Sequence, residues 1–89
     1  MAQLSGKLTV VTGAAQGIGR GVATLFAGRG ADLALWDQKA SQLALVRDEI
    51  QKLGRRCIAT AVDVTNWTQV DQASKLAVQQ LGGIDVLVN

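Results

Sequence analysis

The stretch Thr12-Gly13-Ala14-Ala15-Gln16-Gly17-Ile18-Gly19 decides how this chain of 89 residues folds. It follows the β-branched run 8–12, which predicts a strand, and it precedes apolar residues at helical spacing. A turn between a strand and a helix presents backbone N–H groups with partial positive charge to an anion. Glycines suit such a turn because some positions need positive φ, and because a Cβ would hold a phosphate away from the backbone. The stretch therefore predicts a strand, a phosphate-binding turn and a helix.

Apolar runs and glycine breakers divide the rest of the chain into alternating helices and strands. The strands expected after the turn are residues 33–36, 57–62 and 84–89. The apolar positions at helical spacing are Ile18, Val22, Leu25 and Phe26 in the first helix, Leu43, Val46, Ile50 and Leu53 in the second, and Val70, Ala73, Ala77 and Leu81 in the third. Asn66, three residues before Gln69, resembles a capping box that opens the third helix.

The resulting element order, βαβαβαβ, predicts an α/β fold. Strands that are apolar on both faces are typical of a parallel sheet covered by helices. Connections between parallel strands cross over with a right hand, which leads to a doubly wound sheet of the Rossmann type. A chain of this length holds one small core, so residues 1–89 are predicted to belong to a single domain, and the fold with its glycine turn favours a dinucleotide-binding one.

Composition excludes several classes of function. The net charge is only +2, and Arg55 and Arg56 are the only adjacent basic residues, so no nucleic-acid-binding stripe is predicted. No apolar run is long enough for a membrane span or a signal peptide. A single cysteine, Cys57, is expected in the core, forms no internal disulfide and favours a cytoplasmic protein. The chain has no histidine and no tyrosine, so a zinc site and acid–base chemistry by those side chains are not expected.

The glycine spacing and one carboxylate favour NAD as the ligand. The pattern G-x-x-x-G-x-G lacks the lysine of a nucleoside-triphosphate loop. Asp37 ends the second strand 18 residues after Gly19, close to the offset of about 20 residues expected for a ribose-binding carboxylate. It would accept both ribose hydroxyls and repel a 2′-phosphate, while Gln16 and Gln38 nearby are not basic. NADP is therefore less favoured. The alternatives are ordinary turn glycines and a solvated aspartate at a strand end.

These motifs resemble the short-chain dehydrogenases/reductases along essentially the whole chain. Residues 12–19 are similar to the T-G-x-x-x-G-x-G cofactor motif of that family. Asp63-Val64 after the third strand resembles the pair that meets the adenine ring, and residues 84–89 resemble the start of the fourth-strand signature, which continues Asn-Ala-Gly. The resemblance implies these cofactor-binding residues: Gly13, Gln16, Gly17, Ile18, Gly19, Asp37, Asp63, Val64 and Asn89.

The resemblance also implies a role for each residue. The three glycines would form the pyrophosphate turn, with the Ile18 N–H on a phosphate oxygen. Asp37 would hold the adenosine ribose, Asp63 the adenine amino group, and Val64 a neighbouring backbone contact. Asn89 would contact ribose at the far end of the fourth strand. A helix-capping carboxylate and a turn residue are the alternatives for Asp63 and Asn89.

Catalysis in the family uses a Tyr-x-x-x-Lys pair with a serine on later segments, which this chain does not contain. No catalytic residue and no metal ligand is therefore assigned. Three interpretations stay open. The chain is the N-terminal portion of an enzyme that transfers hydride between NAD(H) and a carbonyl or secondary alcohol, such as a 3-oxoacyl thioester, a sugar or a small alcohol. Otherwise it is a non-catalytic dinucleotide-binding half-domain, or a Rossmann-fold interaction fragment.

The predicted half-domain also has consequences for its partners. A small-molecule substrate is expected only in a longer enzyme, because the family's substrate site lies in its C-terminal half. The fourth strand would have an unpaired edge, and one sheet face would carry two helices while the other carries one. Exposed apolar surface of this kind favours self-association, and members of the family are commonly dimers or tetramers.

Overall fold

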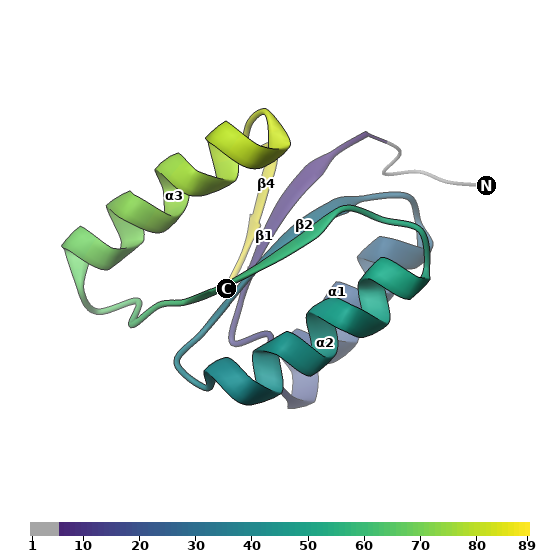
Figure 1. Cartoon of the computed structure of the whole chain (residues 1–89), viewed down its shortest axis with the longest axis horizontal. Coiled ribbons are helices and arrows are strands. Elements are labelled where there is room, and N and C mark those ends of the chain that lie inside the picture. Colours follow the sequence, from purple (N-terminus) through teal and green to yellow (C-terminus); the bar gives the residue numbers. More distant parts are fainter. Residues whose placement is uncertain (1–5) are drawn as a thin grey trace.

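A computed structural model describes residues 6–89, which form four strands and three helices (Figure 1). In chain order these are β1 (Leu8–Thr12), α1 (Gly17–Gly28), β2 (Asp32–Asp37), α2 (Ala40–Lys52), β3 (Cys57–Ala61), α3 (Trp67–Leu81) and β4 (Val86–Val88). The predicted alternation is confirmed. No helix within residues 6–89 is both long and apolar enough to cross a membrane.

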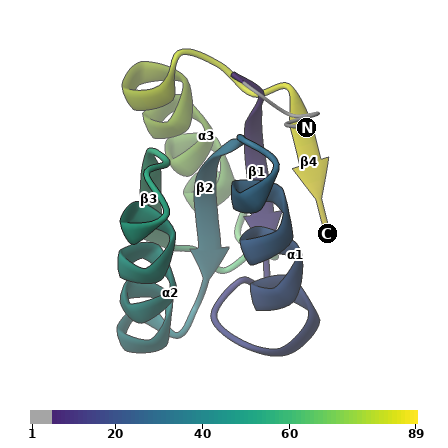
Figure 2. The ribbon, with the colours of Figure 1, turned by 90° about the vertical axis from the view of Figure 1, so that its right-hand side faces the viewer.

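The four strands form one parallel sheet in the order β3-β2-β1-β4 (Figure 2). Val10 of β1 pairs with Ala34 of β2 and with Leu87 of β4, so β1 lies inside the sheet. The chain steps outward from β1 to β2 and β3, and α3 then returns it to the other side of β1. This change of direction defines the doubly wound Rossmann-like fold and confirms the predicted fold class.

The helices cover the two faces of the sheet unequally, as the sequence predicts (Figure 1). One core lies under α1 and α2 and consists of Val11, Ala14, Ala15, Ala23, Ala27, Ala31, Leu33, Leu35, Leu43, Val46, Ile50 and Cys57. The other lies under α3 and consists of Leu8, Val10, Ala34, Trp36, Val62, Ala73, Ala77 and Leu81. Alternate residues of β1 and β2 contribute to opposite cores because successive side chains of a strand point to opposite faces.

Two helices bury a different set of side chains from the one that apolar spacing suggests. In α1 the buried residues are Ala23 and Ala27, while Ile18 is 88% exposed and Leu25 is 53% exposed. Small residues bring α1 close to the sheet, which turns the larger side chains outward. Leu53 is also exposed because it lies at the C-cap of α2, beyond the last helical turn. Only Val22 and Phe26 of the α1 set pack partly against the core.

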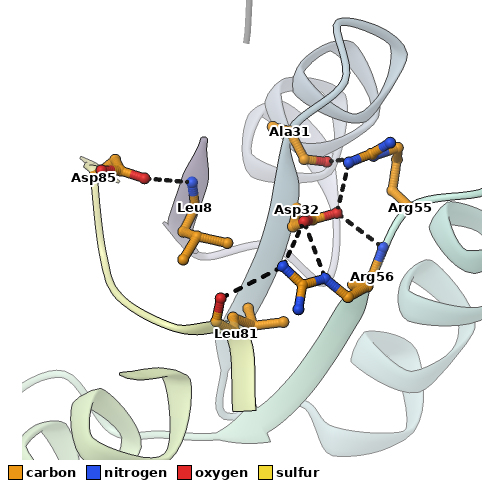
Figure 3. Close-up of polar contacts among 7 residues, drawn as sticks. All are labelled: Leu8, Ala31, Asp32, Arg55, Arg56, Leu81 and Asp85. Carbon is orange, nitrogen blue, oxygen red and sulfur yellow. Dashed lines mark hydrogen bonds and ion pairs between the residues drawn. The ribbon is translucent and has the colours of Figure 1, made fainter. Parts of the chain in front are cut away.

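The strands also differ from their predicted bounds. β2 begins one residue earlier than predicted, at Asp32, and β3 ends at Ala61. β4 is limited to Val86–Val88. At its start, the backbone N–H of Asp85 donates to the carbonyl of Leu8 (2.8 Å), and the Leu8 N–H donates to the Asp85 carboxylate (2.9 Å). This reciprocal contact aligns the beginning of β4 with the beginning of β1, and Figure 3 shows its bond from the Leu8 N–H to the Asp85 carboxylate.

A buried carboxylate joins the amino ends of β2 and β3 (Figure 3). Asp32, whose side chain is only 5% exposed, accepts hydrogen bonds from the guanidinium groups of Arg55 and Arg56 at 2.9 Å each. It also accepts from the Arg56 backbone N–H (3.1 Å). Arg55 also donates to the carbonyl of Ala31, the residue before β2, and Arg56 to that of Leu81, the last residue of α3. The adjacent arginines therefore have a structural role.

The pKa of Asp32 follows from the balance of these contacts. Burial alone would raise the pKa, but the hydrogen bonds from Arg56 and the positive charges of both arginines outweigh it and hold the pKa below its ordinary value of 3.8. A lowered pKa in the folded state stabilises the fold at pH values above the unfolded pKa. That contribution is lost as the pH falls through the folded pKa.

Cys57 belongs to the core beneath α2, as expected. It is 4% exposed, and burial raises the pKa of its thiol to about 12. The thiol is thus protonated at neutral pH and is a poor nucleophile. No group of three or more histidine, cysteine, aspartate or glutamate side chains within residues 6–89 is placed to hold a metal ion.

Replacing Asp32 with Asn is expected to lower the free energy of unfolding by about 2 kcal/mol at pH 7, because charged hydrogen bonds to two arginines are lost. Urea unfolding followed by far-UV circular dichroism measures this change. Asp48→Asn is the control, because the half-exposed Asp48 side chain bonds only that of its neighbour Arg47 among the described residues. Below about pH 3.8 the wild-type chain should lose stability more steeply than Asp32→Asn. Equal acid dependence of the two chains would contradict the role of Asp32.

Candidate functional site

A cleft opens where β1, β2 and β3 end at the carboxyl edge of the sheet. Its volume is about 290 Å³. The lining residues are Thr12, Gly13, Trp36, Asp37, Gln38, Val62 and Val64. In open α/β sheets, ligands bind outside the carboxyl ends of the strands, so the cleft lies where the fold favours binding.

The glycine turn runs from β1 into α1 beside this cleft. Gly13 has φ +63° and Gly17 has φ +61°, a left-handed conformation that disfavours residues with a Cβ. The turn bends twice at these glycines, and Ala14 and Ala15 between them are buried. Both glycines are therefore required by backbone conformation, and neither would meet a neighbouring atom with an added Cβ.

Gly19 is required for a different reason, namely a close approach of backbone to backbone. An added Cβ would lie 2.1 Å from the carbonyl oxygen of Gly13 and 3.1 Å from that of Thr12. No flexible side chain is available to move away, because both atoms belong to the main chain. Gly19 thus lets the first turn of α1 rest directly on the end of β1.

The N-terminus of α1 has no side-chain cap. Gln16 occupies the N-cap position in an extended conformation and makes no capping hydrogen bond, and the first turn contains no acidic residue. The N-terminus of α3, in contrast, is capped by Asn66. The Ile18 side chain points into solvent, so this predicted site residue offers its backbone to the site. Uncapped N–H groups with partial positive charge suit a phosphate.

Asp37 links the end of β2 to the glycine turn. One carboxylate oxygen accepts from the Ala15 N–H (3.1 Å) and the other from the Lys39 N–H (3.0 Å). The Ala14 N–H donates to the carbonyl of Trp36 (3.3 Å), which makes a second link. Each carboxylate oxygen can accept more than one hydrogen bond. Asp37 can therefore orient the turn and still accept from a ligand in the cleft.

Asp63 lies at the end of β3 in a tight turn. Its Oδ1 accepts from the Thr65 hydroxyl (2.6 Å) and the Thr65 N–H (2.9 Å), and these bonds hold the pKa of Asp63 below its usual value. With Gln38, Ala61, Val62 and Gln69 it lines a second hollow of about 440 Å³. Val64, the next residue, is 54% exposed and lines the cleft of about 290 Å³.

The predicted capping box at α3 forms only in part. The Asn66 side chain accepts from the Gln69 N–H (3.1 Å), as expected. The reciprocal bond, in which the Asn66 N–H would donate to the Gln69 side chain, is absent among the described contacts, because that N–H donates to the carbonyl of Asp63 (2.9 Å). The Gln69 Oε1 accepts instead from the Asp63 N–H (2.8 Å).

Asn89 follows β4 and reaches the same edge of the sheet. Its Oδ1 lies 3.3 Å from the hydroxyl of Thr12, which also lies 3.3 Å from the carbonyl of Val88. The fold thus places all predicted site residues along the carboxyl edge, with Asn89 beside β1 and Asp63 beyond β2.

Other residues line the site without having been predicted from the sequence. Thr12, Trp36 and Val62 line the cleft, and Gln69 contacts Asp63. Thr12 is the last residue of β1, Trp36 is the last but one of β2, and Val62 directly follows β3. In a parallel sheet such positions share one edge, and this rule could have found them. Gln69 carries no comparable signal, because its side chain reaches back across a turn.

The fold and this edge define a Rossmann-like α/β protein with a glycine turn suited to a phosphate. The family model described as "short chain dehydrogenase" matches residues 7–89. The chain therefore belongs to the short-chain dehydrogenase family, and its relatives in that family are oxidoreductases.

Individual relatives align with this chain along nearly its whole length. Oxidoreductase UcpA of Salmonella typhimurium is 42% identical over 89 residues, which is 100% of this chain and 34% of that protein. The 7alpha-hydroxysteroid dehydrogenase of Escherichia coli K12 is 38% identical over 87 residues, or 98% of this chain and 34% of that protein. A solved structure of 7alpha-hydroxysteroid dehydrogenase complexed with NADH and 7-oxo glycochenodeoxycholic acid superposes with a TM-score of 0.95 at 38% identity, covering 99% of this chain and 34% of the other. The chain thus spans about a third of the length of these relatives.

Replacing Gly19 with Ala is expected to destabilise the fold by about 1–3 kcal/mol, since the main chain must shift to admit the Cβ. Gly21→Ala, two residues further along α1, should instead stabilise by about 0.5–1 kcal/mol, because its Cβ would meet nothing within 4 Å. Urea unfolding of the two variants beside the wild-type chain measures both changes. A Gly19→Ala variant as stable as Gly21→Ala would refute the close approach.

Proposed function

We propose that this chain is the N-terminal part of a single dinucleotide-binding domain that binds NAD for an oxidoreductase. The observation that carries this proposal is the contact of Asp37 with the Ala15 N–H, because it sets a carboxylate beside an uncapped glycine turn. When bound, the cofactor accepts or donates a hydride, with a carbonyl or secondary alcohol as the other reactant. The residues of this chain bind and orient it.

The glycine turn is proposed to hold the pyrophosphate. Gly13 and Gly17 present no side chain, so the main chain can approach an anion closely. The Ile18 N–H belongs to the uncapped first turn of α1 and would donate to a phosphate oxygen. Gly19 packs against the Gly13 carbonyl and so supports the turn. It is less exposed than Gly13 and Gly17 and is proposed to contact the ligand less.

Asp37 is proposed to select NAD over NADP. Its oxygens lie at the lip of the cleft and would accept from the ribose hydroxyls of NAD. A 2′-phosphate at that place would meet a like charge, and Gln16 and Gln38 provide no compensating cation. The 7alpha-hydroxysteroid dehydrogenase structure named above was complexed with NADH, which is consistent with this preference.

The two ends of the cofactor are proposed to meet different residues. Val62 and Val64 provide apolar walls for the adenine, and Asp63 would accept from its amino group. Asn89, beside Thr12, is proposed to contact the ribose at the other end.

The rest of the proposal concerns a longer protein. A cytoplasmic enzyme acting on a 3-oxoacyl thioester, a sugar or a small alcohol fits the family, with the substrate held by segments beyond this chain. Self-association is proposed as well, since Ile84 is 40% exposed and Leu87 57% exposed beside the free edge of β4.

The NAD preference is tested by titrating the chain with NAD and NADP and following the fluorescence of Trp36, which lines the cleft. A Trp67→Phe background removes the other tryptophan, which is 81% exposed. NAD should bind at least about tenfold more tightly than NADP, and Asp37→Asn should reduce that ratio by about tenfold while keeping an acceptor for Ala15. Asp48→Asn, a matched charge change on α2, should leave the ratio unaltered. Equal affinity of the wild-type chain for both cofactors would contradict the selection.

The oxidoreductase proposal is tested by sequencing the coding region past Asn89. The reading frame is expected to continue with Asn-Ala-Gly, a serine and then Tyr-x-x-x-Lys, because those residues complete the chemistry of the family. A stop codon directly after Asn89 would instead favour the alternative of a non-catalytic dinucleotide-binding half-domain or an interaction fragment.

A further inference from the structure

We propose that Gln69 is a positioning residue for adenine recognition, acting through Asp63. This inference rests on the proposed function, in which Asp63 accepts a hydrogen bond from the adenine amino group. Gln69 itself would touch neither the pyrophosphate nor the riboses. Its side chain would decide how firmly the Asp63 turn is held at the edge of the site.

The contacts of Gln69 join the start of α3 to the end of β3. Its backbone N–H donates to the Asn66 side chain (3.1 Å), which caps the helix. Its side-chain Oε1 accepts from the Asp63 N–H (2.8 Å). The helix is thus capped without the Gln69 side chain, whose bond serves the Asp63 turn instead.

Asp63 is held at three points as a result. Its N–H donates to Gln69, its carbonyl accepts from the Asn66 N–H (2.9 Å), and its Oδ1 accepts from Thr65 twice. Among the described residues, these contacts leave the other carboxylate oxygen, Oδ2, as the one that can accept from a ligand. The direction of that oxygen depends on the backbone orientation of Asp63, to which the bond with Gln69 contributes.

The contacts around Gln69 indicate that loss of its side-chain acceptor would affect adenine recognition alone. Gln69 and Asp63 line the same hollow of about 440 Å³, together with Gln38. The glycine turn and Asp37 are held by separate bonds, from Ala14 and Ala15 to the end of β2. Loss of the Gln69 acceptor should therefore loosen the Asp63 turn and leave the ribose and pyrophosphate contacts in place.

The test compares NAD with nicotinamide hypoxanthine dinucleotide, which carries a carbonyl oxygen where adenine carries the amino group. In the Trp67→Phe chain, NAD should bind about tenfold more tightly, because the Asp63 carboxylate accepts from an amino group but repels a carbonyl oxygen. Gln69→Met keeps the length and removes the acceptor, and should reduce this preference to about twofold or less. Affinity for the hypoxanthine dinucleotide should change little.

Two further variants separate positioning from a general loss of structure. Gln69→Glu keeps an acceptor for the Asp63 N–H and should retain most of the preference. Gln72→Met makes the same replacement three residues further along α3, at an exposed residue, and should behave as the parent chain. Hydrogen exchange gives an independent measure: the Asp63 amide should exchange about fivefold faster in Gln69→Met than in Gln72→Met.

The outcomes distinguish this inference from the function on which it rests. If the parent chain binds neither dinucleotide, the proposed NAD binding is wrong; if it binds both equally, the adenine role proposed for Asp63 is wrong. If the parent chain prefers NAD and Gln69→Met keeps the full preference, Gln69 is not a positioning residue. Unchanged exchange of the Asp63 amide in Gln69→Met overturns the inference whatever the chain binds.

Discussion

The close contact between the first turn of α1 and the end of β1 is the constraint on which the rest of the structure depends. Gly19 lies so near the Gly13 carbonyl that no Cβ fits between them. This contact fixes the start of the helix at the sheet edge, and Ala23 and Ala27 continue the close packing along the helix. The same approach aims the uncapped N-terminus of α1 along the carboxyl edge of the sheet. Close packing and a geometry suited to an anion thus come from one local feature.

The carboxylates at the two edges of the sheet have different hydrogen-bond donors. At the amino edge, Asp32 is buried and neutralised by two arginines, so its charge is used within the fold. At the carboxyl edge, Asp37 and Asp63 accept from backbone N–H groups, Asp63 also accepts from a hydroxyl, and both carboxylates are partly exposed to solvent. A carboxylate bonded by neutral donors retains most of its field. The carboxyl edge therefore stays suited to hydroxyl and amino donors, while the amino edge stabilises the sheet.

The sequence predicts the element order, the turn and the edge on which the site lies, because these depend on local signals. β-branched runs, glycine breakers and an aspartate at a strand end are read over a few residues. The outward orientation of Ile18 and Leu25 was not predicted, since helical spacing does not say which arc of α1 faces the sheet. The contact of Gln69 with Asp63 was also missed. The Asn66 N–H could donate to the Gln69 side chain or to the Asp63 carbonyl. It donates to the carbonyl, and only the geometry of the folded turn determines this choice.

Asp37 shows why recognition and folding cannot be separated at this site. Its carboxylate orients the glycine turn through Ala15 and the start of α2 through Lys39, so its position is fixed before any ligand arrives. A group that is already held loses little conformational freedom when it accepts a further hydrogen bond. The preference proposed for a free ribose hydroxyl over a 2′-phosphate would then follow from the fold itself. Because the charge and the turn share one side chain, a change of cofactor preference at this position must also preserve an acceptor for the Ala15 N–H.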